Sequence, residues 1–161
     1  MKKFAGDAGL HQAAFTANRS TDDHIFVARR VMEENWNEGE TLYIMALDIK
    51  KAFDTVKIQA LKEILKRLDV PTRLINRVLQ CVKDEVTRIL WQNQLSEEAK
   101  RGKGIKQGCP LSPMLFNLIM QDVLRKVEEE IPELKLMDVN CLVLPLILAF
   151  ADDVLLTYIL T

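Results

Sequence analysis

Two short apolar runs in this chain lead directly into aspartate. TLYIMALDI, at residues 41–49, contains Asp48, and LILAF, at residues 146–150, is followed one residue later by Asp152 and Asp153. Both runs contain strand-forming residues without an alternating polar face, which predicts strands that are covered on both sides. Aspartate is a poor strand former and is costly to bury without a partner. A bound cation would offset that cost.

The three aspartates supply oxygen ligands of the kind that magnesium prefers. Magnesium is held by one or two carboxylates together with substrate phosphates, and a pair of such ions can activate an attacking oxygen and stabilise a leaving one. If the two strand ends meet, Asp48, Asp152 and Asp153 would suit this chemistry. The adjacent pair also has a simpler explanation, because exposed hairpin turns are often rich in aspartate.

Length and composition predict one folded domain. A chain of 161 residues is long enough for one core, and its 48% of hydrophobic and 28% of charged residues are typical of globular proteins. Lys and Arg number 22 against 23 Asp and Glu, so the overall charge does not indicate a nucleic-acid partner. Cys81, Cys109 and Cys141 lack metal-ligand or disulfide spacing. They indicate a reducing, intracellular compartment, with nucleus and cytoplasm left open.

The apolar residues 141–160 are long enough to span a membrane, but their sequence argues against a span. Asp152 and Asp153 lie near the middle, where each would cost roughly 2.5 to 3.5 kcal/mol in a membrane, and Pro145 interrupts the run. The N-terminal residues contain no apolar run of signal-peptide length. We therefore expect two buried strands that meet at a turn, and no membrane partner.

Apolar spacing of three and four residues predicts helices around these strands. The helices are expected to begin near Ser20, Lys57, Pro71 and Ser112, and a hairpin is expected to join residues 87–91 to 97–101. Gly39 should end the first helix, and Val123 should lie on the inner face of the last one. This mixed order indicates an α+β domain, with helices on one face of a central sheet.

Three longer motifs contain or separate the aspartates. ALDIKKAFDTV surrounds Asp48, RGKGIKQGCPLSPMLFNL covers residues 101–118, and FADDVLL contains Asp152 and Asp153. In this order they resemble motifs A, B and C of reverse transcriptases, and QGCPLSPMLFN is especially similar to the non-LTR (LINE-type) retrotransposon and group II intron branch. NRSTDDHIF resembles the segment that leads into motif A in that branch. The resemblance therefore spans nearly the whole chain.

The resemblance implies a metal site. Asp48 and Asp152 would be the main metal ligands, Asp153 would be the third catalytic acid, and the carbonyl of Ile49 would complete a coordination shell. The cofactor would be two Mg²⁺ ions, with Mn²⁺ as a substitute.

Other motif positions imply contacts with nucleotides. Phe53 would lie against the sugar of the incoming nucleotide and exclude a 2′-hydroxyl group; from the residues alone it reads as a core phenylalanine. Gln107 and Gly108 would support that nucleotide, although they also fit a glycine-rich loop before a helix. Phe150 and Ala151 would lie beside the primer end, where core packing is the alternative.

The implied reaction is the attack of a DNA primer 3′-hydroxyl on the α-phosphate of a deoxynucleoside triphosphate, directed by an RNA template. The implied fold is a palm-like antiparallel sheet with partial fingers and no thumb. We expect residues 1–161 to form a partial reverse transcriptase domain, with residues 1–40 on the finger side and residues 41–161 in the palm. We also expect this piece alone to have little or no polymerase activity.

Two other functions are compatible with the same residues. An RNA-dependent RNA polymerase palm would share the acidic residues, and Phe53 argues against it. A decayed or domesticated retroelement remnant could bind nucleic acid or protein without catalysis, although the intact aspartates argue against that alternative.

Overall fold

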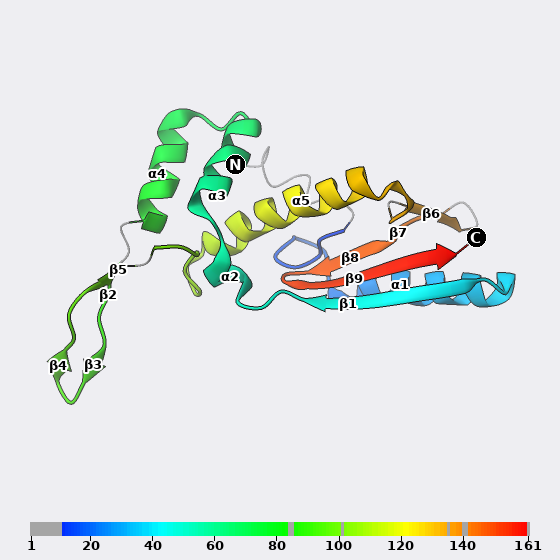
Figure 1. Ribbon diagram of the computed structural model, residues 1–161, viewed down its shortest axis with the longest axis horizontal. Coiled ribbons are helices and arrows are strands. Elements are labelled where there is room, and N and C mark those ends of the chain that lie inside the picture. The colour runs from blue at the N-terminus through cyan, green and yellow to red at the C-terminus, as the bar shows by residue number, and fades with distance from the viewer. Residues whose placement is uncertain (1–10, 84–85, 101, 135, 140–141, 161) are drawn as a thin grey trace. The chain divides into compact units, whose positions relative to one another are not determined.

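The computed structural model describes residues 11–83, 86–100, 102–134, 136–139 and 142–160. Helices and antiparallel strands alternate irregularly along the chain (Figure 1), as the sequence predicts for an α+β domain. Two compact units are present: Met1–Lys50 with Asn117–Thr161, and Lys51–Phe116. The expected division between a finger-side segment, residues 1–40, and a palm, residues 41–161, remains a prediction. Arg101, which belongs to the expected hairpin, and Cys141 lie outside the described residues.

The first unit contains a three-stranded antiparallel sheet. Its strands are β1 (Thr41–Asp48), β8 (Ile147–Phe150) and β9 (Asp153–Leu160), in the order β1-β9-β8. β8 and β9 form the expected pair of strands that meet at a turn. β1 pairs with β9 along its whole length, so that Asp48 lies opposite Asp153. The register therefore brings the two acidic strand ends to the same end of the sheet.

Helix α1 (Thr21–Glu38) has the ends that its sequence predicts. The hydroxyl group of Ser20 accepts a hydrogen bond from the amide of Asp22, and the carboxylate of Asp23 accepts one from the amide of Ser20. Gly39 ends the helix at a φ of +68°, a conformation that glycine adopts without steric cost. Both ends of the helix were therefore predictable from local sequence.

Helix α1 packs on a small hydrophobic core. Two paired antiparallel strands also contribute to this core: β6 (Leu136–Val139) and β7 (Leu142–Pro145). The short 3₁₀ helix η1 (Pro132–Leu134) precedes β6. The buried members of this core are Val31, Val139, Leu144 and Leu146. Pro145 is the last residue of β7, a strand end being a position that suits a residue that cannot donate a ladder hydrogen bond.

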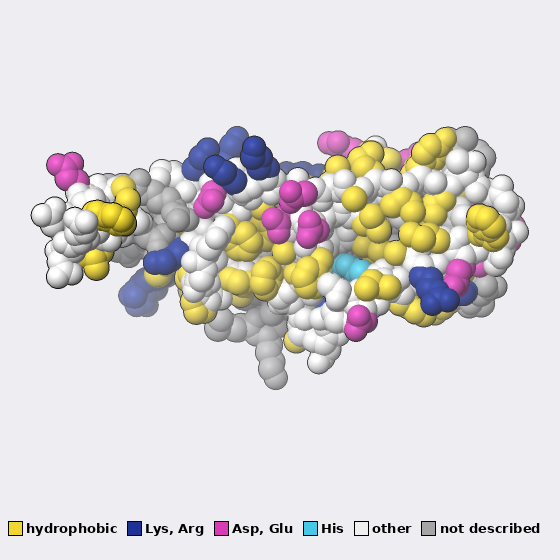
Figure 2. Space-filling model, turned by 90° about the horizontal axis from the view of Figure 1, so that it is seen from below, with side chains coloured by type: hydrophobic (Ala, Val, Ile, Leu, Met, Phe, Trp, Pro, Cys, Tyr) yellow, Lys and Arg dark blue, Asp and Glu magenta, His cyan; other side chains and the backbone are white. Residues whose placement is uncertain are grey.

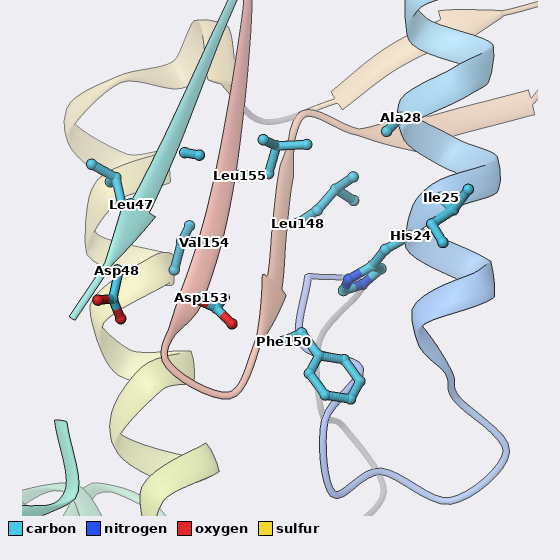
Figure 3. Close-up of a pocket in the computed structure, with 11 residues that line it drawn as sticks. His24, Ile25, Ala28, Leu47, Asp48, Leu148, Phe150, Asp153, Val154 and Leu155 are labelled. Atoms are coloured by element: carbon cyan, nitrogen blue, oxygen red, sulfur yellow. The ribbon is translucent and has the colours of Figure 1, made fainter. Parts of the chain in front are cut away.

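The sheet lies between two helices (Figures 1 and 3), where the sequence predicted helices on one face only. Helix α5 (Ser112–Glu130) lies on the side away from α1 and is tied to the N-terminal segment. Asn117 Nδ2 donates to the carbonyl of Ala14 at 2.7 Å. The one-face prediction fails because α1 has its own apolar face to bury. The buried residues of α5 are Ser112, Leu115, Phe116, Asn117, Met120 and Leu124. Val123 is exposed, so its expected inner position is wrong.

Strands β8 and β1 differ in burial. Ile147, Leu148 and Ala149 of β8 are buried, as predicted. In β1 only Leu42 is half-buried and every other residue is exposed, so the prediction that β1 is covered on both sides is wrong. β1 is an edge strand of the sheet formed by the described residues. Hydrophobic side chains, shown in yellow, accordingly spread over the surface formed by α1 and β1 in Figure 2.

The second unit contains three helices and a hairpin. The helices are α2 (Ala52–Thr55), α3 (Ile58–Arg67) and α4 (Thr72–Lys83), and the last two agree with the predicted starts at Lys57 and Pro71. The apolar faces of α3 and α4 pack together, with Leu61, Ile64, Leu65, Ile75 and Leu79 buried.

The hairpin of the second unit has a shorter connection between its strands than expected. β2 (Val86–Thr87) pairs with β5 (Ala99–Lys100), and β3 (Leu90–Trp91) pairs with β4 (Gln94–Leu95). The chain turns at Gln92 and Asn93, which both have positive φ. The second strand, expected at residues 97–101, therefore begins earlier, at Gln94, because asparagine accepts the left-handed turn conformation.

None of the helices formed by the described residues is both long and apolar enough to cross a membrane.

Candidate active site

Asp48 and Asp153 are cross-strand partners at the end of the sheet. Asp48 is the last residue of β1, Asp153 is the first of β9, and each lies directly opposite the other. Directly opposed residues of antiparallel strands have Cβ atoms about 4.5 to 5.5 Å apart and point to the same face, and like charges in this arrangement repel each other. Both side chains are exposed to solvent. The pair would therefore be stabilised by a cation between the carboxylates.

The turn between β8 and β9 places Asp152 beside the residue that follows β1. The amide of Ile49 donates to the carbonyl of Asp152 at 3.3 Å, which extends the contact of the two strand ends by one step. Ala151 has a φ of +57°, a left-handed conformation that costs a residue with a Cβ roughly 1 to 2 kcal/mol. Three of the predicted site residues, Asp48, Ile49 and Asp152, are thus brought together with Asp153 by backbone pairing.

A pocket of about 430 Å³ opens beside these strand ends. Asp48 and Asp153 line it together with Phe150, whose ring stands at the end of β8 (Figure 3). The rest of the wall is mainly apolar: Ile25, Ala28, Ala46, Leu47, Leu148, Val154 and Leu155. The pocket therefore has two carboxylates at one end of a hydrophobic surface.

His24 is a polar residue of the pocket wall that was not among the predicted site residues. Its side chain projects from the first turns of α1 toward β8 (Figure 3). Nε2 is buried and has no hydrogen-bond partner within the part of the chain that the structure describes. Burial lowers the pKa of His24, the charge of Arg19 lowers it further, and Asp23 opposes both effects. The imidazole is therefore mainly neutral at pH 7.

The carboxylates fit a magnesium site that is completed by substrate. Among the described residues, no group of three or more His, Cys, Asp and Glu side chains is arranged to hold a metal ion. A site made wholly of protein ligands is therefore not formed there. Magnesium commonly uses only one or two carboxylates, with water and substrate phosphates as its other ligands. The hard oxygen atoms of the Asp48 and Asp153 pair suit that mode of binding.

Phe53 belongs to the second unit and is held in place by an aromatic contact. Its ring stacks on Phe116, with centroids 4.5 Å apart and an interplanar angle of 12°. The carbonyl of Phe53 accepts a hydrogen bond from the amide of Ile105 at 2.9 Å, and the carbonyl of Val56 accepts one from Gly104 at 2.9 Å. Helix α2 and the glycine-containing loop therefore pack together and fix the ring.

The loop that contains Gln107 and Gly108 depends on two glycines in different ways. Gly108 has a φ of +85°, and a Cβ atom built there would meet nothing within 4 Å, so the space beside it is open to a ligand. Gly104 has a φ of +89°, and its Cβ would lie 2.8 Å from the Cα and carbonyl oxygen of Asp54. Gln107 is exposed. Of these two glycines, Gly104 is therefore the one whose backbone packs closely against another segment of the chain. It was not among the predicted site residues.

Solved structures with a similar fold include telomerases. The structure of telomerase from Candida albicans in complex with the TWJ fragment of telomeric RNA has a TM-score of 0.68 and 15% identity, over 97% of this chain and 29% of that chain. Apo telomerase from Candida tropicalis, truncated from its C-terminal domain, has a TM-score of 0.63 and 16% identity, over 88% and 29%. At these identities the likeness shows the fold alone.

The sequence relationship is closer and shows the family. The model of the family described as reverse transcriptase (RNA-dependent DNA polymerase) matches residues 2–158. Pol polyproteins of type-1 retrotransposable element R2 are similar too: that of Nasonia vitripennis is 31% identical over 77% of this chain, and one from Popillia japonica is 32% identical over 74%. The chain spans only 12% and 19% of these two relatives.

This chain belongs to the reverse transcriptase family. The resemblance of its three motifs to that family, and to non-LTR retrotransposons in particular, is confirmed by the family match and the R2 relatives. The family match favours the reverse transcriptase alternative over an RNA-dependent RNA polymerase palm.

Proposed function

We propose that this chain contains the nucleotidyl-transfer site of a retrotransposon reverse transcriptase, which adds deoxynucleotides to a DNA primer 3′-hydroxyl as directed by an RNA template. The observation that supports this most directly is the register that places Asp48 opposite Asp153, with Asp152 in the adjoining turn. Asp48, Asp152 and Asp153, with the carbonyl of Ile49, would hold two Mg²⁺ ions together with water and the phosphates of the substrate. Bound there, the ions would supply positive charge for the attacking and leaving oxygens of the reaction.

The residues around the acids would position the reactants. Catalysis of this kind depends mainly on alignment of the two oxygens with the phosphorus atom and requires no covalent intermediate on the protein. Phe150 and Ala151 would lie beside the primer end, and the apolar pocket wall would receive the sugar and base of the last primer nucleotide. The neutral ring of His24 suits an uncharged hydrogen-bonding group in that pocket better than it suits a phosphate.

Binding of Mn²⁺ to the purified chain tests the metal site. Electron paramagnetic resonance would measure free Mn²⁺ during a titration, with and without a deoxynucleoside triphosphate. We expect Asp48→Asn to weaken binding at least about tenfold, because a hard anionic ligand is lost. Asp138→Asn removes an exposed aspartate from β6 in the same unit and should leave binding unchanged. Equal binding by the wild-type chain and Asp48→Asn would contradict the proposed site.

Phe53 is the proposed gate against ribonucleotides, and Gln107 and Gly108 are proposed to support the incoming nucleotide. The stacking of Phe53 on Phe116 supports the gate, since a fixed ring can exclude a 2′-hydroxyl sterically. In a polypeptide with measurable primer extension, Phe53→Val should raise the incorporation of ribonucleotides relative to deoxynucleotides about tenfold or more. An unchanged ratio of ribonucleotide to deoxynucleotide incorporation would contradict the proposed role of Phe53, whatever the overall rate of primer extension. An inactive purified chain would agree with the expected low activity of this piece alone.

A further inference from the structure

The N-terminal segment around Gln12 runs beside β8 as a short parallel strand. The amide of Ala149 donates to the carbonyl of His11 at 2.7 Å, and the amide of Ala13 donates to the carbonyl of Ala149 at 3.0 Å. These two bonds cover the edge of β8 that is not paired with β9. Gln12 is therefore placed beside the strand that leads into the acidic turn.

The side chain of Gln12 continues this pairing into the turn itself. Its Oε1 accepts hydrogen bonds from the amides of Ala151, at 2.9 Å, and Ala14, at 3.0 Å. Its Nε2 donates to the carbonyl of Ala151 at 3.1 Å. The carboxamide thus contacts both backbone groups of Ala151, as a neighbouring strand would do, although the two residues are 139 positions apart in sequence.

Gln12 is fully buried, with 0% of its surface exposed. An uncharged amide in such a place needs hydrogen-bond partners, and both acceptor positions of Oε1 and one hydrogen of Nε2 are used. Its partner Ala151 has a left-handed backbone that an alanine adopts only under constraint from its surroundings. Two constraints therefore act on this turn: the two-residue connection between Phe150 and Asp153, which requires a positive φ at its first position, and the Gln12 carboxamide.

We propose that Gln12 is a positioning residue of the active site: its carboxamide holds Ala151 in the left-handed conformation and so sets Asp152 and Asp153 against the end of β1. The proposal rests on the proposed function of these acids. Rotation at Ala151 would move the next two residues together. It would separate the carbonyl of Asp152 from the amide of Ile49, and Asp153 from its register position.

A purely structural role for Gln12 is the alternative. A buried amide that satisfies neighbouring backbone groups stabilises any core, and its loss would then affect the whole unit equally. The two roles differ in what happens at Ala151. If Gln12 positions the turn, its loss should increase the mobility of the turn more than that of the surrounding sheet. Metal binding should weaken as the mobility of the turn increases.

The test compares Gln12→Met with the wild-type chain of 161 residues. Methionine has a similar length and shape but cannot make the three hydrogen bonds. Amide hydrogen exchange would be measured by NMR at Ala151. The amide of Thr157 in β9 is the reference, since it donates to the carbonyl of Leu146, the residue before β8, at 2.9 Å. We expect exchange at Ala151 to accelerate at least tenfold more than exchange at Thr157. Mn²⁺ binding should weaken at least tenfold.

Asn35→Leu is the matched control. Asn35 is also a buried amide of the first unit, and its Nδ2 donates to the carbonyl of Val31 at 2.8 Å, within α1. Its loss should accelerate exchange at Ala151 and Thr157 by the same factor and leave Mn²⁺ binding unchanged. If Gln12→Met does not fold, Gln12→Asn takes its place, because it keeps the amide and is one methylene too short to reach both groups of Ala151.

A second substitution at the turn provides a rescue experiment. Glycine adopts a φ of +57° without a Cβ clash. The double variant Gln12→Met, Ala151→Gly should therefore bind Mn²⁺ at least threefold more tightly than Gln12→Met alone. A defect of core packing would not be repaired by the added glycine. The proposal is overturned if Gln12→Met accelerates exchange equally at Ala151 and Thr157, or leaves Mn²⁺ binding unchanged. If the wild-type chain itself binds no Mn²⁺, the proposed function fails, and the exchange ratio alone decides whether Gln12 holds the turn.

Discussion

Strands β1 and β8 are both rich in apolar residues and lie in the same sheet, yet they differ in their surroundings. Each is an apolar run that leads to aspartate. Ile147 of β8 is 0% exposed, whereas Ile44 of β1 is 45% exposed. Both are outer strands of the β1-β9-β8 sheet, but the segment around Gln12 covers the outer edge of β8. The burial of these strands therefore depends on what lies beside them and not on their own apolar content.

The largest effect should come from a matched pair of isoleucine truncations. Ile147→Ala removes a fully buried side chain and should lower the free energy of unfolding by about 2 to 5 kcal/mol, because it loses transfer energy and leaves a cavity. Ile44→Ala makes the same chemical change in β1 and should cost less than about 1 kcal/mol. Urea unfolding of both variants would measure the difference. Similar costs at the two positions would show that β1 is as well packed as β8.

A smaller effect on stability is expected from a charge on the edge strand. Met45 is 56% exposed on β1, and exposed apolar edge strands promote association between chains. Met45→Lys should change the free energy of unfolding by no more than about 0.5 kcal/mol. It should also reduce self-association, which sedimentation velocity over a range of concentrations would measure.

Gln80→Lys serves as the control for that experiment, since it adds the same charge at an exposed position of α4 in the second unit. If Gln80→Lys reduced association as much as Met45→Lys, net charge and not the edge of β1 would be responsible. No association of the wild-type chain at any concentration would also remove the edge strand from consideration.

Local signals in the sequence predicted local structure well. The ends of α1 follow from Ser20 and Gly39, because a cap and a left-handed glycine act over a few neighbouring residues. The expected strand that leads to Asp48 and the expected pair of strands around Asp152 and Asp153 also correspond to the structure, because both motifs contain the acid itself. Helix starts and the acidic positions were therefore accessible to sequence reasoning.

Long-range relationships were not accessible in this way. Hydrophobic periodicity shows that β1 is apolar but does not show whether another segment covers it. Val123 fits a helical spacing, yet α5 buries Leu124 and leaves Val123 exposed. Gln12 occurs in a segment without any pattern, and its partner Ala151 is 139 residues away. In the sequence Gly104 is one of several glycines in a loop, and nothing in the pattern indicates that its backbone packs against that of Asp54.

The pairing of β1 with β9 also has a consequence for the order in which the chain folds. β1 is synthesised long before β9, and the first unit is formed by residues that precede the second unit in sequence and residues that follow it. Contacts between distant residues form slowly, because the intervening loop must close before they contribute. Helices α3 and α4, whose contacts are local, can form during synthesis. The acidic site should therefore be among the last features to assemble, with the apolar face of β1 accessible to chaperones until β9 arrives.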